Sequence, residues 1–446
     1  MAQADISYVI DTTSRYAVGA GKHLVARYNA RTGEITNSHP ILEDLGDVLP
    51  FLWYCDGKET AKFEFENAKR LLSQDLMYQN PQCDRDWMVY TYDWTDLLHG
   101  LIEYHRLAAD SEAIDLANTL FSAWEQKFTK NNIVFGRGIK FGHIVLPIPL
   151  STLNDVGMFP ELILNFGRCF SDERSKQLKK LACSIVDQWL CDPITKQTGL
   201  FPTVLSPVIS AIGIFRWFCA KSVYELTRKR SDSVILFKHN TNAIASVLAV
   251  FKETGSKRYA DAIRHWSEGL SKYLLQDNGT ICTEWRIKDG VIKEATSVNF
   301  QVVDLMCDIA QSTREQCYLE IARKVANTWI SMRGKTGLIP HQNFGTRKGQ
   351  GLSDMQTDFS VALVKLSVLT GDAIYSEAAE EIMSAVRRHL YMECGMATWV
   401  DTDTGTVIDS ECKTKFHVLS LKGWLALEHK DKIYIDNEFT EMLGDR

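Results

Sequence analysis

Apolar residues recur along most of the chain at spacings of three, four and seven, which places them on one face of a helix. In paired segments the first is more apolar, whereas the second carries charge on one face. We therefore expect helical hairpins, each with an inner helix buried on most sides and an outer helix that faces solvent. The clearest pairs are 92–108 with 109–128, 233–255 with 256–275, and 354–371 with 372–391.

The connections between these segments are of two kinds. Those from a first to a second helix are short and carry capping residues, as in "TGSKRY" from 254 and "TGDAIY" from 370. The return connections are longer, and several place a Gly ahead of β-prone residues. We expect short β-hairpins in these loops, gathered on one rim. The stretches are "TGLIPHQN" (336–343), "TGLFPTV" (198–204) and "NGTICTEW" (278–285), with looser relatives "CGMATWVD" (394–401), "TGEITNSHP" (32–40) and "NNIVFGRG" (131–138).

Hairpins that alternate tight turns with long loops can close into a ring. A helix at 5–29 makes seven hairpins if it partners the first or last inner helix, and six result if one pair lies outside the ring. An α-solenoid is the alternative, but its repeats would be more uniform and would need no β segments. We predict an all-α fold, an (α/α)6 or (α/α)7 toroid of helical hairpins with short β-hairpins on one rim, spanning 1–446 as a single domain. The inner helices are expected to begin near 42, 93, 153, 235, 297, 354 and 413.

Composition narrows the class of protein. With 45% hydrophobic and 24% charged residues, the 446-residue chain is typical of a globular protein with a large core. A net charge of -6 and the absence of a basic run with interleaved aromatics argue against nucleic-acid binding. The 11 Cys are dispersed without a CxxC pair, and the N-terminus shows no secretory signal pattern. We therefore expect reduced thiols and a cytoplasmic location.

One apolar segment, "FPTVLSPVISAIGIFRWFCAK" (201–221), raises the question of membrane contact. Pro207 and Arg216 interrupt it, and it is short for a membrane span. Two interpretations follow. It is either a buried helix or a surface element that touches a membrane or a lipid-linked substrate.

The first turns of the expected inner helices are unusually polar, and in a ring they would surround the centre at the loop-rich rim. An Asp or Asn there is often only a helix cap. However, aromatic and amide side chains alternate with the carboxylates, as sugars require for their C–H faces and hydroxyl groups. The candidates are Glu43, Asp44, Asp47, Tyr92, Asp93, Trp94, Asp96, Asn154, Asp155, His239, Asn240, Asn299, Gln301, Asp354, Gln356, Asp358, Lys413, Lys415 and His417, with Glu284, Trp285, His341, Gln342 and Asn343 in the loops.

The stretch "GLSDMQTDFSVALVKLSVLTGDAIYSEAAEEIM" (351–383) resembles the inner–outer hairpin of the α/α-toroid carbohydrate enzymes. These are the six-hairpin glycosidases and, with a similar shape, the N-acylglucosamine 2-epimerase group. The resemblance covers nearly the whole chain as architecture, without a catalytic signature of either family. It implies a carbohydrate as the substrate.

Cleavage of a glycosidic bond requires two carboxyl groups on opposite sides of that bond, one protonated and one ionised. Opposed inner helices can hold such a pair. We expect Asp93 with Asp354, followed by Asp44, and by Glu284 as an acid on a loop. The leading hypothesis is a glycoside hydrolase, with a lipid-linked glycan among the possible substrates. The substrate-binding candidates are Tyr92, Trp94, Asp96, His239, Asn240, Trp285, His341, Gln342 and Asp358.

Two other functions stay open. A sugar epimerase would remove a proton from a carbon next to a carbonyl, for which His239 and His341 are available. A sugar-binding ring without catalysis would keep the aromatic residues but would need no acid pair. The sequence contains no HExxH, EF-hand or dinucleotide-binding pattern, so it implies no metal and no cofactor, although a carboxylate-rich rim could hold Ca²⁺.

Overall fold

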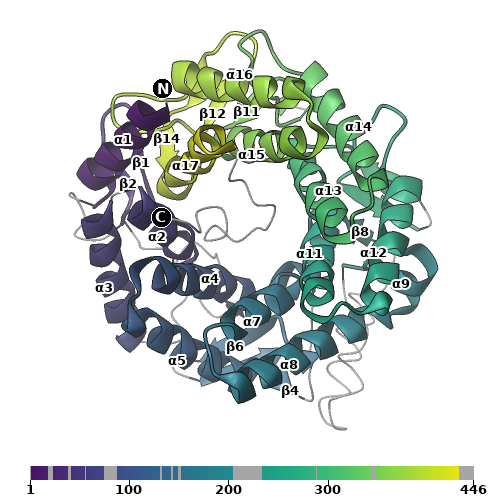
Figure 1. Ribbon diagram of the computed structural model, residues 1–446. Helices are drawn as coiled ribbons and strands as arrows, with labels where there is room; N and C mark the ends of the chain where they lie inside the picture. Colours follow the sequence, from purple (N-terminus) through teal and green to yellow (C-terminus); the bar gives the residue numbers. More distant parts are fainter. Residues whose placement is uncertain are drawn as a thin grey trace.

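The helices of the computed structural model form an inner and an outer ring (Figure 1). Each inner helix contacts the next along the chain, and the last contacts the first, so the inner ring is closed. The described residues are 2–18, 24–38, 42–55, 57–74, 88–130, 133–141, 144–148, 152–203, 234–287, 289–342 and 347–430. The inner helices are α2 (Leu42–Tyr54), α4 (Thr91–Ala108), α7 (Phe159–Gly167), α11 (Phe237–Thr254), α13 (Phe300–Thr313), α15 (Ser353–Thr370) and α17 (Thr414–Glu428).

The outer helices complete seven hairpins within the described part of the chain. Each packs on the inner helix that precedes it, except α1, which packs on α17. The last hairpin is thus assembled from the two ends of the described chain. This arrangement confirms the predicted toroid and selects seven hairpins over six. The outer helices are α1 (Ala2–Thr12), α3 (Lys58–Gln74), α5 (Ser111–Phe128), α8 (Asp172–Leu190), α12 (Lys257–Gly269), α14 (Cys317–Ser331) and α16 (Ala373–His389).

The predicted N-terminal helix over 5–29 is wrong at its C-terminal end. The helix ends with a π-helical turn, Thr13–Val18. Arg27–Asn29 forms a strand that pairs with the strand Glu411–Lys413. Six of the seven predicted starts of the inner helices agree with the observed starts to within one turn. The predicted start near 153 instead falls on a separate short helix ahead of α7. The other short elements are α6 (Leu153–Val156), α9 (Pro193–Thr198), a π-helical turn (Leu270–Leu274) and a 3₁₀ turn (Ser297–Asn299).

In the described part of the chain, four antiparallel sheets of three strands share one plan. In each sheet, one strand leads directly into an inner helix. It pairs with a β-hairpin that lies in the connection after the outer helix of the same helical pair. The strand that enters α17 instead pairs with the hairpin that follows α1, so this sheet also closes the ring. The sheets are β3 (Met88–Tyr90) with β6 (Arg137–Phe141) and β7 (Ile144–Ile148), β8 (Val234–Leu236) with β9 (Glu284–Arg286) and β10 (Gly290–Lys293), β11 (Gln350–Leu352) with β12 (Trp399–Asp401) and β13 (Val407–Asp409), and β14 (Glu411–Lys413) with β1 (Arg27–Asn29) and β2 (Ile35–Asn37), beside the pair β4 (Thr129–Lys130) and β5 (Ile133–Val134).

Amide side chains at the start of three inner helices hold the repeated Gly-centred connections. Each amide donates from its NH₂ group to the carbonyl of one connection residue and accepts from the N–H of the same residue. A planar amide can satisfy both backbone groups of a buried residue in this way. The pairs, with the donated and then the accepted distance, are Asn240 with Phe201 (3.0 and 2.8 Å), Asn299 with Ile281 (2.9 and 2.8 Å) and Gln356 with Ile339 (2.7 and 2.8 Å).

A Gly lies two residues before each clamped residue. Gly199, Gly279 and Gly337 have φ values of 76°, 82° and 94°. Side chains with a Cβ rarely adopt that conformation. The recurring motif therefore consists of a turn that needs Gly and a buried backbone that needs an amide from the next helix.

The amide of Asn299 is expected to be important for stability. It is fully buried, and its Oδ1 also accepts from Trp329 Nε1 at 3.1 Å. Asn299→Ala leaves three buried groups without a partner, so we expect the free energy of unfolding to fall by about 3 kcal/mol or more. Denaturant unfolding of this variant beside Asn118→Ala, an exposed asparagine on α5, is the measurement. Equal stability of the two variants would contradict the clamp.

Most of the apolar segment 201–221, which was interpreted as either a buried helix or a membrane-contacting surface element, lies outside the described residues, at 204–221. Phe201 and Pro202 at its start are buried in the ring. Among the described helices, none is long and apolar enough to cross a membrane. The nine cysteines described carry free thiols.

Candidate active site

A cavity of about 370 Å³ lies inside the ring, and all seven inner helices contribute to its wall. Apolar side chains such as Phe51, Leu162 and Phe300 alternate with many polar ones. A site of this size that combines apolar surface with convergent polar groups is typical of small-molecule binding. The polar residues are Asp47, Thr95, Asp96, His99, Glu103, Glu161, Asn165, Thr241, Asn242, Gln301, Asp304, Asp358, Lys365 and Lys422.

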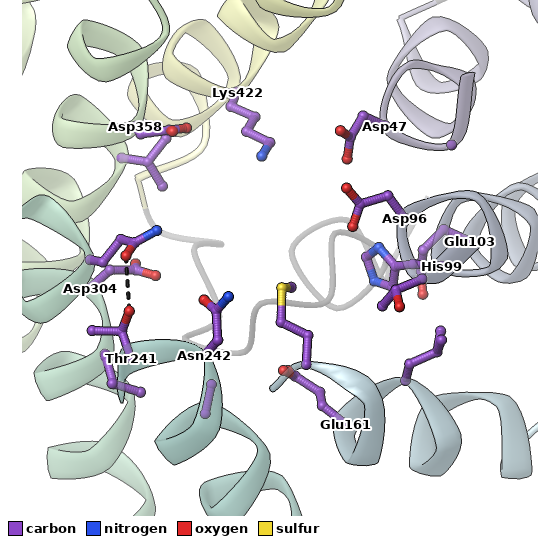
Figure 2. A pocket seen from close by; sticks show the side chains of 18 of the residues that line it. Asp47, Asp96, His99, Glu103, Glu161, Thr241, Asn242, Asp304, Asp358 and Lys422 are labelled. Carbon is purple, nitrogen blue, oxygen red and sulfur yellow. Dashed lines mark hydrogen bonds between the residues drawn. The ribbon is translucent and has the colours of Figure 1, made fainter. Parts of the chain in front are cut away.

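Carboxylates approach the cavity from facing sides. Figure 2 shows Asp358 and Asp304 on the side of α15 and α13, and Asp47 and Asp96 across the cavity on α2 and α4. Burial raises the pKa of the Asp358 carboxyl, and the carboxylates of Asp304 and Asp47 raise it further, while Lys422 and Lys415 act in the opposite direction. Asp358 is therefore suited to carry a proton into the cavity.

Lys415 holds the carboxylates on the α2 and α4 side of the cavity. Its ammonium group forms an ion pair with Asp47 and lies 3.9 Å from Asp96 Oδ2. Because Lys415 belongs to the last inner helix, this cation joins α17 to α2 and α4 where the ring closes. His99 follows Asp96 by one turn of α4 and also lines the cavity.

Glu103 lies deeper on α4, and its side chain is 1% exposed. Its Oε1 accepts from Arg106 Nη1 at 2.8 Å, and Arg106 Nη2 donates to the Asn165 carbonyl at 3.2 Å. Glu103 Oε2 is buried and has no hydrogen-bond partner among the described residues. This oxygen is therefore a buried acceptor that is enclosed by the protein.

A buried ion group supports the side of α13 and α15. Lys365 Nζ lies 2.6 Å from Asp304 Oδ1 and 3.2 Å from Asp308 Oδ1, and its side chain is 3% exposed. Burial alone would lower the pKa of Lys365, but the two aspartates outweigh burial and raise it. The ammonium group therefore stays charged and fixes Asp304 at the cavity wall.

Side chains of α11 and α13 are linked at the same wall. Thr241 Oγ1 donates to Gln301 Oε1 at 2.9 Å, and Asn242 points into the cavity beside them (Figure 2). These groups can donate to and accept from hydroxyl groups without adding charge. Among the described residues, no three His, Cys, Asp or Glu side chains are grouped as a metal site would require.

Of the predicted catalytic residues whose side chains are described, Asp354, Asp44 and Glu284 are not among the lining residues of the cavity. Asp354 is one turn nearer the start of α15 than Asp358, its Oδ1 accepts from the Met355 N–H at 2.9 Å, and burial with the charge of Asp358 raises its pKa to about 7. Asp44 is half-buried on α2. Asp93 lies in the first turn of α4, but its side chain and that of Tyr92 are outside the described residues.

The prediction of Glu284 as an acid on a loop is wrong. It lies on β9, where its carboxylate pairs with Arg286 at 3.2 Å and Lys293 at 3.3 Å. The side chain is 9% exposed, so both cations and the sheet enclose it. A group held in this way stabilises the sheet.

Of the predicted substrate-binding residues, Asp96 and Asp358 line the cavity. Trp94, Trp285 and Asn240 instead have structural roles. Trp94 is 2% exposed and packs edge-on against Phe128 in the core, so the prediction for it is wrong. Trp285 is 9% exposed and packs on Tyr273. Asn240 forms the backbone clamp described above.

The two histidines proposed for proton transfer lie off the cavity wall. Burial, with Lys238 and Arg137 nearby, lowers the pKa of His239 to about 4. His341 Nδ1 hydrogen-bonds to Ser297 Oγ at 2.9 Å, and its ring packs edge-on against Trp399. The neighbouring Gln342 forms isolated β-bridges with Thr296 and Lys348. His99 is the histidine on the wall that the prediction did not include.

No protein-family model matches the sequence, and no curated protein does. Solved structures match it over nearly its whole length. An α-1,2-mannosidase from Trichoderma reesei has a TM-score of 0.66 and 11% identity, covering 96% of this chain and 93% of its own. A D-mannose isomerase has a TM-score of 0.60 and 9% identity, with 96% and 97% covered.

The cellobiose 2-epimerase from Bacillus thermoamylovorans B4167 is also similar, with a TM-score of 0.53 and 10% identity over 94% of this chain and 95% of its own. At such identities the similarity concerns the fold alone. The chain therefore has the α/α-toroid fold of the six-hairpin glycosidases and of the N-acylglucosamine 2-epimerase group.

Proposed function

We propose that this protein is a carbohydrate-active enzyme that hydrolyses a glycosidic bond in the central cavity. The observation that carries the proposal is the pair of carboxylate groups on facing sides of one cavity, Asp358 on α15 and Asp96 with Asp47 on α2 and α4. The wall also offers apolar surface and uncharged hydrogen-bonding groups, which suit the two faces of a sugar ring. The fold shared with glycosidases agrees with this function.

In the proposed reaction Asp358 is the general acid. Its proton moves to the glycosidic oxygen as the bond from that oxygen to the anomeric carbon breaks, and the leaving alcohol departs neutral. Asp96 either takes a proton from the water that attacks the anomeric carbon or attacks that carbon itself, and water then releases the sugar. Lys415 is a positioning residue, because it holds Asp47 and Asp96 on their side of the cavity.

Proton transfer at carbon is the second candidate function, and His99 is the observation that favours it. This imidazole lines the cavity one turn from Asp96, where it could take a proton from a carbon beside a sugar carbonyl. The same proton, or one from solvent, would return to the adjacent carbon or to the opposite face. Similar toroids include a D-mannose isomerase and a cellobiose 2-epimerase.

A single panel separates the two functions. Purified protein is incubated in D₂O with neutral disaccharides and trisaccharides, and proton NMR follows both new reducing ends and loss of the C2 proton. We expect new reducing ends without deuterium at C2, and their rate should fall in Asp96→Asn. Loss of the C2 proton that is abolished in His99→Gln would instead establish proton transfer at carbon, with deuterium at C2 of the product for an epimerase and at C1 of a ketose for an isomerase. Neither change with any sugar of the panel would contradict both.

A further inference from the structure

Lys422 is a cation of the cavity wall that is not held by a protein carboxylate. It belongs to α17, is half-buried and extends into the cavity (Figure 2). Its ammonium group lies 5.6 Å from the centroid of the Phe51 ring, and it forms no ion pair or hydrogen bond with a described residue. The other lysine of the wall, Lys365, is instead enclosed in its buried ion group. The ammonium group of Lys422 is therefore available to act on groups inside the cavity.

Two lysines of α17 serve opposite sides of the cavity. Lys415 and Lys422 are seven residues apart and so lie on the same face of the helix. Lys415 pairs with Asp47, which belongs to the α2 side. Lys422 extends between that side and Asp358 (Figure 2), and Asp358 forms no ion pair with a described residue. Because Asp47 already has a cation, Asp358 is the carboxyl group that Lys422 can serve.

The helices that carry Lys422 and Asp358 approach each other closely at this level. A Cβ atom added to Gly423 would lie 3.3 Å from Thr357 Cγ2 and 2.6 Å from Met383 Sδ. Gly423 and Thr357 are the sequence neighbours of the two charged residues. The absence of a side chain at 423 thus allows α17 to pack against α15 at the height where both charged residues reach the cavity wall.

Lys422 also has the largest effect of any cation on the Asp358 carboxyl. Burial raises the pKa of Asp358, and Lys422 is the strongest influence in the opposite direction. No described lining residue comes from the outer helices α14 and α16, which also pack on α15. The charged groups that act on Asp358 are Asp304 on α13, Asp47 on α2, Asp354 on α15 itself, and Lys415 with Lys422 on α17.

We propose that Lys422 is a positioning residue of this reaction, whose ammonium group stabilises the carboxylate left on Asp358 when the proton moves to the glycosidic oxygen. A negative charge that forms in a partly buried cavity is costly unless a cation lies near it. The bond from the glycosidic oxygen to the anomeric carbon breaks as that oxygen takes the proton, and Lys422 keeps its own protons throughout. The inference rests on the proposed function for the role of Asp358, whereas the electrostatic coupling of the two groups does not depend on it.

Titration of Asp358 tests the coupling without a substrate. NMR of protein labelled with ¹³C at the Asp carboxyl groups follows this group as the pH changes, and Asp358→Asn identifies its signal. We expect Lys422→Met and Lys422→Gln to raise the pKa of Asp358 by about one pH unit, and Lys422→Arg, which keeps the charge, to change it little. Two neutral variants are used so that a folding defect in one leaves the test intact.

Kinetics with the best sugar of the panel test the role in the reaction. A raised pKa keeps Asp358 protonated to higher pH, so the alkaline limb of kcat/KM should move upward by the same amount in Lys422→Met and Lys422→Gln. Because the carboxylate product is less stabilised, kcat should fall about tenfold. Lys422→Arg should restore most of this loss.

Lys430→Met is the matched control. Lys430 lies just beyond α17 and pairs with Glu380, and the two side chains are 34% and 56% exposed. This variant should leave the pKa of Asp358 and the alkaline limb unchanged. An unchanged pKa in both neutral variants, or an equal shift in Lys430→Met, overturns the inference even if the protein hydrolyses glycosides.

The remaining outcomes separate the inference from the proposed function. A shift of the Asp358 pKa without a shift of the alkaline limb means that another group supplies the proton, so it overturns the inference although a hydrolase stands. The expected pKa shift in a protein that cleaves no glycosidic bond overturns the proposed function and with it the catalytic part of the inference, while the coupling of Lys422 with Asp358 stands.

Discussion

Asp358→Asn is expected to reduce the rate of glycosidic cleavage by about 10³-fold. The amide keeps the size of the side chain but cannot deliver a proton to the leaving oxygen. Binding of a neutral sugar should change little, because the wall keeps its other polar groups. The measurement is kcat and KM for the best substrate of the panel, with circular dichroism to confirm that the variant folds.

The dependence of this reaction on pH provides a check on the role of Asp358. A general acid must be protonated, and burial raises the pKa of this carboxyl. Activity should therefore fall as the pH rises through that raised pKa, and this alkaline limb should be absent from the residual activity of Asp358→Asn. Asp354→Asn is the control, since Asp354 lies one turn away and off the cavity wall. An equal loss of rate in both variants would contradict the assignment.

Lys365→Met is expected to lower the free energy of unfolding by about 3–5 kcal/mol, because it leaves the carboxylates of Asp304 and Asp308 buried without their cation. Both aspartates lie within 3.2 Å of the ammonium group. The loss should be smaller at acidic pH, because burial raises the pKa of Asp308 and this carboxyl is then protonated, which removes its unpaired charge. Denaturant unfolding at about pH 5 and at about pH 8 measures the difference.

Lys69→Met is the control for that experiment. Lys69 makes ion pairs with Glu66 and Glu112, but its side chain is 31% exposed and both partners are 64% exposed. We expect a loss of about 1 kcal/mol or less there, as is usual for surface pairs. If the two lysine variants lost the same stability at pH 8, the buried ion group would not have the structural role assigned to it.

The architecture was predictable because its signals are local and repeat. The spacing of apolar residues identified the helices, and the alternation of short and long connections identified the ring. The contacts that close the ring were harder to predict from the sequence. Arg27–Asn29 pairs with Glu411–Lys413, and α1 packs on α17, but no local signal links segments so far apart in the chain.

The candidate site was predicted only in part, because the helical candidates all came from the first turns of the expected inner helices. Asp47, Asp96, Gln301 and Asp358 came from those turns and do line the cavity. Three amides from the same region, Asn240, Asn299 and Gln356, instead hold the connections. Their roles depend on backbone groups of other repeats, which a sequence pattern does not locate.

The deeper residues carried a signal that could have been used. His99 and Glu103 follow Asp96 at i+3 and i+7, and Lys365 follows Asp358 at i+7. Such spacings place polar side chains in one stripe along a helix that is otherwise apolar. In an inner helix that stripe faces the centre of the ring, so it marks the wall of the cavity.

The most direct test of a sugar site between the facing carboxylates is a crystal structure of Asp358→Asn with the neutral glycoside that binds best in the panel. The variant should trap the sugar before cleavage. We predict a sugar ring in the central cavity, between the side of α15 that carries residue 358 and the side of α4 that carries Asp96. A sugar bound only at the loops or on the outer surface, with the cavity holding water, would contradict it.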